Sequence, residues 1–164
     1  MPHLWHLTVD SAVCTGAADV DRYIFRSNMV PFSNLLWDMR DKKLDYDLMR
    51  RLTGEFARIA HYWLGDYYPL SAFTTDQEAW MAWQFDVPET GEGMVQLFRR
   101  AESPYCSAQF KLQGLDPAAR YALTDLDVRD GARTYTGREL LEPGLSVGIT
   151  NKPGAVVLTY KKLN

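Results

Sequence analysis

Cysteine is scarce in this sequence, and its few potential metal ligands are scattered. The 164 residues contain two cysteines, Cys14 and Cys106, and these form no Cys-x-x-Cys motif. The sequence therefore indicates neither a zinc knuckle nor a disulfide scaffold. His3 and His6, followed by Asp10, do not supply the three or four converging ligands of a zinc site. We expect no bound metal ion.

Long apolar runs are also absent. No stretch approaches the 18 apolar residues of a membrane span, so we expect no membrane partner. The N-terminus, Met1 to Trp5, lacks the basic start and apolar core of a signal peptide. The sequence leaves the compartment open, but the missing signal peptide favours the cytoplasm.

An excess of basic residues is missing as well. Eighteen Lys and Arg residues stand against 21 Asp and Glu residues, which gives a net charge of −3. The chain thus lacks the clustered cations that bind phosphate backbones, and we expect no nucleic-acid partner. No Gly-x-Ser-x-Gly motif or phosphate-binding glycine loop occurs, so nothing supports a serine hydrolase or a nucleotide-binding protein. What is present, 46% hydrophobic and 24% charged residues, is typical of a folded globular protein.

One helix is predicted by a clear periodic pattern. Between residues 45 and 64, apolar residues recur at spacings of three and four, which indicates an amphipathic helix with one buried face. These apolar positions are Leu48, Met49, Leu52, Phe56, Ile59, Ala60 and Trp63. Asp45 is suited to cap the start of the helix, and Gly65 stands where a glycine would end it.

Short alternating segments dominate the chain after residue 70. They are separated by Gly, Pro and Asp, the composition of turns between strands. The predicted strands span residues 79–86, 93–100, 107–113, 121–127, 145–150 and 155–161, and residues 87–92 form a hairpin connection. Six or more strands in this length predict an antiparallel β-sandwich. Before the helix, residues 23–25 and 32–37 are the only strand-like runs.

Carboxylates are the remaining candidates for chemistry. A retaining glycosidase needs two of them, a nucleophile and an acid/base, with carboxyl groups about 5–5.5 Å apart. Asp45 and Asp47 are explained by the start of the helix, and Asp41 lies in an exposed run of charges. Asp38, directly after Trp37, is the best placed to line a pocket at the C-terminal end of a strand. The sequence alone does not give the distance between any two of these groups.

Short segments in a consistent order along most of the chain carry a resemblance to one family. They include YIFRSNM at 23–29, LWDMRD at 36–41, GDYYPL at 65–70, WMAWQF at 80–85, GEGMVQ at 91–96, FRR at 98–100, GLDP at 114–117, TDLD at 124–127 and GREL at 137–140. Together they resemble the end of the barrel and the C-terminal sandwich of bacterial α-galactosidases of glycoside hydrolase family 36.

The resemblance implies a mainly β fold, in which an antiparallel β-sandwich follows a helix and strands from the last part of a (β/α)8 barrel. Residues 1–72, with the helix at 45–64, would belong to the barrel, and residues 73–164 to the sandwich. It also implies a retaining hydrolase of terminal α-galactosides without metal or organic cofactor, in which the sandwich is structural. The chain could assemble as a homo-oligomer or with an upstream barrel chain.

The family's nucleophile and acid/base lie on earlier barrel strands, in motifs without a counterpart here. We therefore assign no catalytic residue, and we expect this chain to be inactive alone. The complete barrel would bind the galactoside, and Arg26, Trp37 and Asp38 are the candidates for substrate contacts at the wall of its pocket.

Two other functions remain open. The chain could be a free-standing carbohydrate-binding module that uses Trp80, Trp83 or Tyr105, because flat aromatic rings stack on sugars. Strand alternation places Trp83 on the core face, whereas Trp80 shares its face with Gln84 and could be exposed. A small hydrolase using two of its own carboxylates, for example Asp38 and Asp66, is the other alternative, although no acid/base motif supports it.

Overall fold

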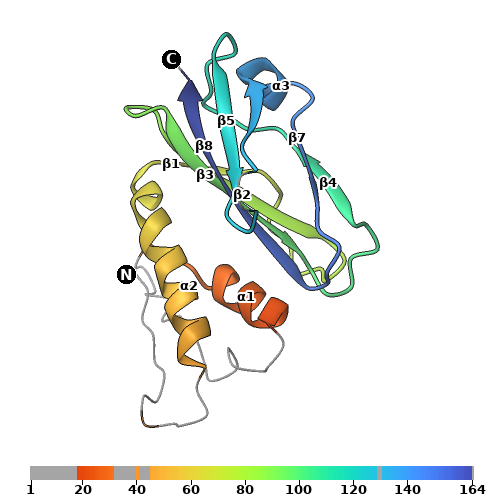
Figure 1. Ribbon diagram of the computed structural model, residues 1–164. Helices are drawn as coiled ribbons and strands as arrows, with labels where there is room; N and C mark the ends of the chain where they lie inside the picture. Colours follow the sequence, from red (N-terminus) through yellow and green to blue (C-terminus); the bar gives the residue numbers. More distant parts are fainter. Residues whose placement is uncertain (1–17, 32–39, 41–44, 129–130, 164) are drawn as a thin grey trace, which may run out of the picture.

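The computed structural model describes residues 18–31, 40, 45–128 and 131–163. They form three layers (Figure 1): helices α1 and α2 lie on one face of a six-stranded sheet, and a two-stranded sheet packs on its other face. In chain order the elements are α1 (Ala18–Ser27), α2 (Tyr46–Ile59), the 3-10 helix η2 (Ala60–Leu64), β1 (Asp66–Pro69), β2 (Trp80–Val87), β3 (Glu92–Arg99), β4 (Ser107–Phe110), β5 (Arg120–Asp125), β6 (Arg133–Thr136), α3 (Gly137–Leu141), β7 (Leu145–Gly148) and β8 (Gly154–Leu163).

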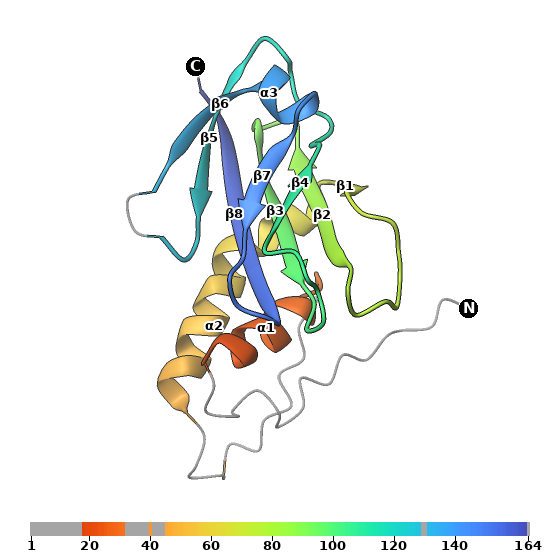
Figure 2. The same cartoon turned by 90° about the vertical axis from the view of Figure 1, so that its right-hand side faces the viewer.

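Every strand pair in the two sheets is antiparallel. The six-stranded sheet has the order β1-β2-β3-β8-β5-β6, and β4 pairs with β7 in the second sheet (Figure 2). The hairpin between β2 and β3 turns at Gly91, whose φ of 65° lies in the left-handed region that glycine adopts at no steric cost. The predicted antiparallel β-sandwich is therefore confirmed.

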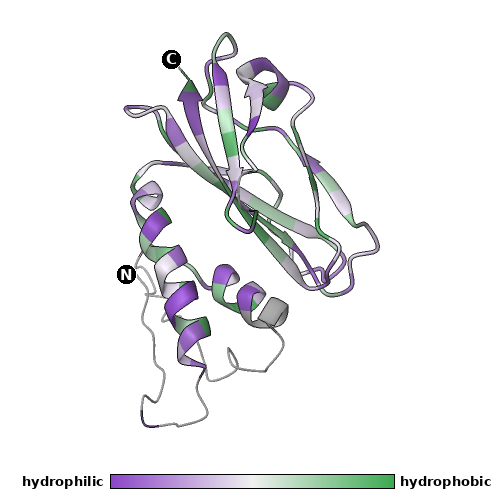
Figure 3. Ribbon diagram, in the orientation of Figure 1, coloured by the Kyte–Doolittle hydropathy of each residue, from purple (hydrophilic) through white to green (hydrophobic). Residues whose placement is uncertain are grey.

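The position of β3 at the centre of the large sheet explains its composition. From Gly93 to Arg99 every residue of this strand is buried. Met94 faces the helices, whereas Val95 and Leu97 face the second sheet. The strand carries apolar residues on both faces because both faces are covered, although Gln96 and Arg99 are buried in it as well. Figure 3 shows hydrophobic residues concentrated along the centre of the large sheet.

Helix α2 forms as its periodicity predicts. Leu52 and Ile59 of α2 are 3% and 1% exposed, and they pack with Met94 and Val157 of the sheet. Burying each such side chain contributes about 1.5–3 kcal/mol. The carboxylate of Asp45 accepts a hydrogen bond from the backbone N–H of Leu48, as a capping residue does. The predicted helix and its cap are confirmed, although residues 60–64 tighten into a 3-10 turn.

One local prediction was wrong, and another was correct for a different physical reason. The strand-like run at residues 23–25 lies in α1, where Phe25 is buried; Met29, two residues after the end of the helix, is buried as well. Three apolar residues are too few to separate the two periods. Gly65 caps the end of the helical segment, as predicted, but its φ of −83° shows that left-handed backbone does not explain the glycine. It is required because a Cβ at this position would overlap the backbone carbonyl of Asp86.

Several short elements escaped prediction. The strand β1 pairs with β2 in a register that places Asp66 opposite Asp86. The edge strand β6 and the short helix α3 follow each other, and α3 begins with a capping box of Thr136 and Glu139. The strand β1 lies before residue 72 and still belongs to the large sheet. The division of the chain into residues 1–72 and 73–164 stays a prediction. The run at 32–37 lies outside the described residues.

Candidate functional site

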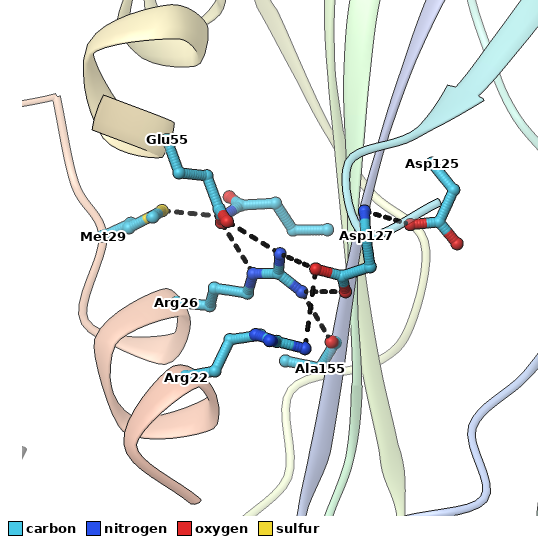
Figure 4. Close-up of polar contacts among 8 residues, drawn as sticks. Arg22, Arg26, Met29, Glu55, Asp125, Asp127 and Ala155 are labelled. Carbon is cyan, nitrogen blue, oxygen red and sulfur yellow. Dashed lines mark hydrogen bonds and ion pairs between the residues drawn. The ribbon is translucent and has the colours of Figure 1, made fainter. Parts of the chain in front are cut away.

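Arg26 is the centre of the most extensive charged cluster in the described part of the chain. It lies in the last turn of α1, and its side chain is fully buried. Figure 4 shows its guanidinium between the carboxylates of Glu55 on α2 and Asp127 after β5. The Nε and Nη2 atoms donate to Glu55, Nη1 and Nη2 donate to Asp127, and Nη1 also donates to the carbonyl of Ala155, at 2.7–2.9 Å.

The five N–H groups of a guanidinium are all used in this arrangement. Both carboxylates bond to it in a two-pronged geometry, the strongest form of such pairs. A sugar hydroxyl could bond to Arg26 only by displacing one of these acceptors. The role of Arg26 as a substrate contact stays a prediction, and the contacts described here join α1, α2 and the end of β5.

The charges of this cluster stabilise one another. Burial by itself would lower the pKa of Arg26, but the hydrogen bonds and charges of Glu55 and Asp127 outweigh burial and raise it. Burial would likewise raise the pKa of Asp127, yet bonding to Arg26 and the nearby charge of Arg22 hold it below its ordinary value. Arg26 and Asp127 are therefore both charged at neutral pH. Neither Glu55 nor Asp127 is available as a nucleophile while it is paired in this way.

A second buried polar group lies inside the sandwich. The hydroxyl of Tyr160 donates to Asp86 at 2.6 Å, and the side-chain amide of Gln84 donates to Tyr160 and to the backbone carbonyl of Gln113. Burial raises the pKa of Asp86 and that of Tyr160. Gly93 makes room for this network, because a Cβ there would overlap the hydroxyl of Tyr160. Asp86 is 3% exposed, so its bonds hold strands together beneath the surface.

Most of the aromatic residues considered for sugar stacking make contacts with other side chains or with the backbone. Trp83 donates its Nε1–H to Gln96 at 2.7 Å, and its ring centroid is 4.8 Å from that of Phe98. Trp80 is half-buried and donates to the backbone carbonyl of Tyr105. The face that Trp80 shares with Ala82 and Gln84 is buried, because the second sheet covers it, so the possibility of an exposed face is not realised. Tyr105 is 71% exposed.

The other predicted site residues lie outside the described part. Trp37 and Asp38 are both in this group, so their roles at a pocket wall stay predictions. Among the described residues, no cluster of three His, Cys, Asp or Glu side chains could hold a metal ion. The helices of the described ranges are too short or too polar to span a bilayer. Sequence reasoning missed Glu55 and Asp127 because they are 29 and 101 positions from Arg26.

One protein family matches the sandwich. The model of the glycosyl hydrolase family 36 C-terminal domain matches residues 80–163, from the start of β2 to the end of β8. No curated protein sequence matches the chain.

Solved structures have the same fold. The family 36 α-galactosidase AgaA of Geobacillus stearothermophilus, in complex with 1-deoxygalactonojirimycin, matches with a TM-score of 0.66 and 19% identity, over 88% of this chain and 19% of that one. AgaB of the same organism matches with 0.62 and 20%, over 88% and 19%. The galactosidase domain of an α-galactosidase-sucrose kinase, AgaSK, matches with 0.54 and 22%, over 78% and 17%. The chain thus spans less than a fifth of the length of these proteins.

Proposed function

This chain belongs to the family of glycosyl hydrolase family 36 C-terminal domains, and from that premise we propose that it is the C-terminal part of a retaining α-galactosidase-type enzyme. In the proposed enzyme the sandwich is structural, and the complete barrel binds and hydrolyses terminal α-galactosides without metal or organic cofactor. The observation that carries the proposal is the family match over all strands from β2 to β8.

The buried charged groups support a structural role. A retaining glycosidase needs two carboxylates that face one sugar, because one attacks the anomeric carbon while the other protonates the leaving oxygen. Here Glu55 and Asp127 are paired with Arg26, and Asp86 accepts a hydrogen bond from Tyr160. Each of these three carboxylates bonds to a neighbouring side chain. The nucleophile and the acid/base are thus proposed to lie in barrel strands upstream.

The Arg26 cluster also suggests how the sandwich would act on a barrel. It fixes α1 and α2 to the segment after β5 and to β8 through bonds that use every guanidinium N–H. Barrel strands that continue from these helices would be held against the sandwich. In this arrangement residues 1–72 contribute the end of the barrel, and Trp37 and Asp38 contact the galactoside ring.

Hydrolysis of 4-nitrophenyl α-galactoside tests the proposal. The purified 164-residue chain should release no nitrophenol above background, whereas a longer protein that includes the in-frame barrel upstream should be active. In the longer protein Asp38→Asn should raise KM, while the control Asp47→Asn, on an exposed side chain of α2, should not. Turnover by the 164-residue chain that disappears with Asp38→Asn would place the chemistry in this chain and overturn the proposal.

The free-standing carbohydrate-binding module through Trp80, Trp83 or Tyr105 has less support. Such a surface needs ring faces open to a ligand. The rings of Trp80 and Trp83 pack against neighbours, and Tyr105 is the exposed one of the three.

A further inference from the structure

A cavity opens on the side of the sandwich where the two sheets diverge. It lies between β5 and β6 of the large sheet and β7 of the small sheet. Its volume is about 240 Å³. Its inner wall is apolar and rigid, since Leu123, Leu145, Val147 and Leu158 are core residues of the sandwich.

Polar side chains line the same cavity without using their hydrogen-bonding atoms. Arg133 and Ser146 are exposed and Tyr135 is half-buried, and none of the three makes a side-chain hydrogen bond to a residue in the described ranges. Asp125 accepts one bond through Oδ1, from the backbone N–H of Asp127, which leaves its second carboxylate oxygen for another donor. These donors and acceptors come from three strands, so the folded sandwich brings them together.

The free edge of β7 adds backbone groups to this set. The N–H of Ile149 bonds to the carbonyl of Cys106 directly opposite, so alternate residues of β7 pair with β4. Ser146 and Gly148 are the intervening residues, and their backbone amides point away from β4. Both line the cavity, and β7 has no second neighbour among the described strands.

The chemistry of these groups selects a class of ligand. One carboxylate and one guanidinium leave no net charge, which favours a neutral molecule. The apolar wall and the ring of Tyr135 suit a C–H face, and the unpaired donors and acceptors suit hydroxyl groups, which both donate and accept. The cavity is smaller than the roughly 300–1,000 Å³ of sites for drug-sized ligands. We propose that it binds a single neutral sugar residue.

This site goes beyond the proposed function. It needs neither a barrel nor a catalytic carboxylate, because every group that forms it lies between Leu123 and Leu158. Even without a barrel, the sandwich would bind a sugar through this cavity, and this binding would not depend on exposed tryptophan rings.

Nuclear magnetic resonance of the ¹⁵N-labelled 164-residue chain tests this inference. Methyl α-galactoside, methyl α-glucoside and mannose are added separately up to tens of millimolar, and backbone amide shifts are followed. The expected result is saturable shifts, for at least one sugar, at residues 123–125, 133–135 and 145–148. Arg133→Met and Asp125→Asn should each weaken that binding by about tenfold, the usual effect of losing a hydrogen bond to a charged group.

The control is Arg138→Met, which removes the same charge from an exposed side chain of α3 outside the cavity. It should leave binding unchanged, and melting curves would show whether each variant folds. The inference fails if no sugar produces saturable shifts, if the shifts map elsewhere, or if Arg133→Met and Arg138→Met behave alike. Because the readout is binding and not turnover, a failed hydrolysis assay would leave this result untouched.

Discussion

Replacing Arg26 with methionine should cost about 3 kcal/mol of unfolding free energy at pH 7. Methionine retains an apolar stem but leaves Glu55 and Asp127, whose side chains are 10% and 27% exposed, without their shared cation. Removing one partner of a buried ion pair costs about 3–5 kcal/mol, because the remaining charge is uncompensated. We take the lower end because Asp127 is partly hydrated. A native stability of roughly 5–15 kcal/mol would leave the variant folded.

Urea unfolding, followed by tryptophan fluorescence and circular dichroism, measures this loss. With a urea dependence of about 1–3 kcal/mol per molar, the midpoint should fall by roughly 1–3 M. The matched control is Arg50→Met, because Arg50 pairs with Asp47 through side chains that are 76% and 78% exposed. An exposed pair of this kind contributes about 0.3–0.5 kcal/mol. The double variant Arg26→Met, Glu55→Met should recover part of the loss, since it removes one of the unpaired carboxylates.

The difference between wild type and Arg26→Met should also depend on pH. The folded pKa of Asp127 is lowered from 3.8, so its contribution to stability is present above pH 3.8 and is lost as pH falls through the lower folded value. In the variant Asp127 has lost the cation that holds its pKa down, so it takes up a proton more readily. The stability difference should therefore shrink below about pH 4. A loss under about 1 kcal/mol at pH 7, or one that stays constant with pH, would refute the reasoning.

Four further substitutions can be measured by thermal or urea unfolding. Gly65→Ala should lower the free energy of unfolding by about 1–3 kcal/mol, because the added Cβ would overlap a backbone carbonyl. Gly54→Ala should raise it by about 0.5–1 kcal/mol, because no atom lies within 4 Å of the added Cβ. Equal effects of the two changes would contradict this reasoning. Phe56→Ala should cost less than the roughly 3–5 kcal/mol of a fully buried ring, because Phe56 is half-buried. Because the folded pKa of Asp86 is raised, its ionisation lowers the stability of the fold as pH rises above 3.8. The stability of Asp86→Asn relative to wild type should therefore increase between about pH 4 and 7. A stability difference that does not change with pH would contradict a raised pKa for this buried carboxyl.

Local patterns were enough to predict the elements whose own residues specify them. The helix at 45–64 follows from apolar residues at one spacing and from a capping aspartate, and both are properties of neighbouring positions. The β2–β3 hairpin follows in the same way from the Pro and Gly residues between two alternating segments. Where the local signal was short, prediction failed. Residues 23–25 were read as a strand, and β6, with the sequence RTYT, has no apolar alternation to mark it.

The candidate sites were predicted less well, because their members are far apart in the sequence. Arg26 was singled out by resemblance, but Glu55 and Asp127 reach it only when α1 and α2 fold over β5 and β8. The sugar-sized cavity likewise draws Asp125, Arg133 and Ser146 from three strands. Residue types alone do not say which of many carboxylates and cations will meet.

By itself the sequence determined a folded chain with an amphipathic helix followed by an antiparallel sandwich, because periodicity and turn chemistry act between residues close in the chain. Only the tertiary structure decided which charges are paired and which residues face a cavity. Gly65 shows the difference: its position suggested the end of a helix, but the reason for a glycine is the backbone of Asp86 on a neighbouring strand. Burial, pairing and close approach depend on contacts between distant segments, and those contacts exist only once the layers have packed.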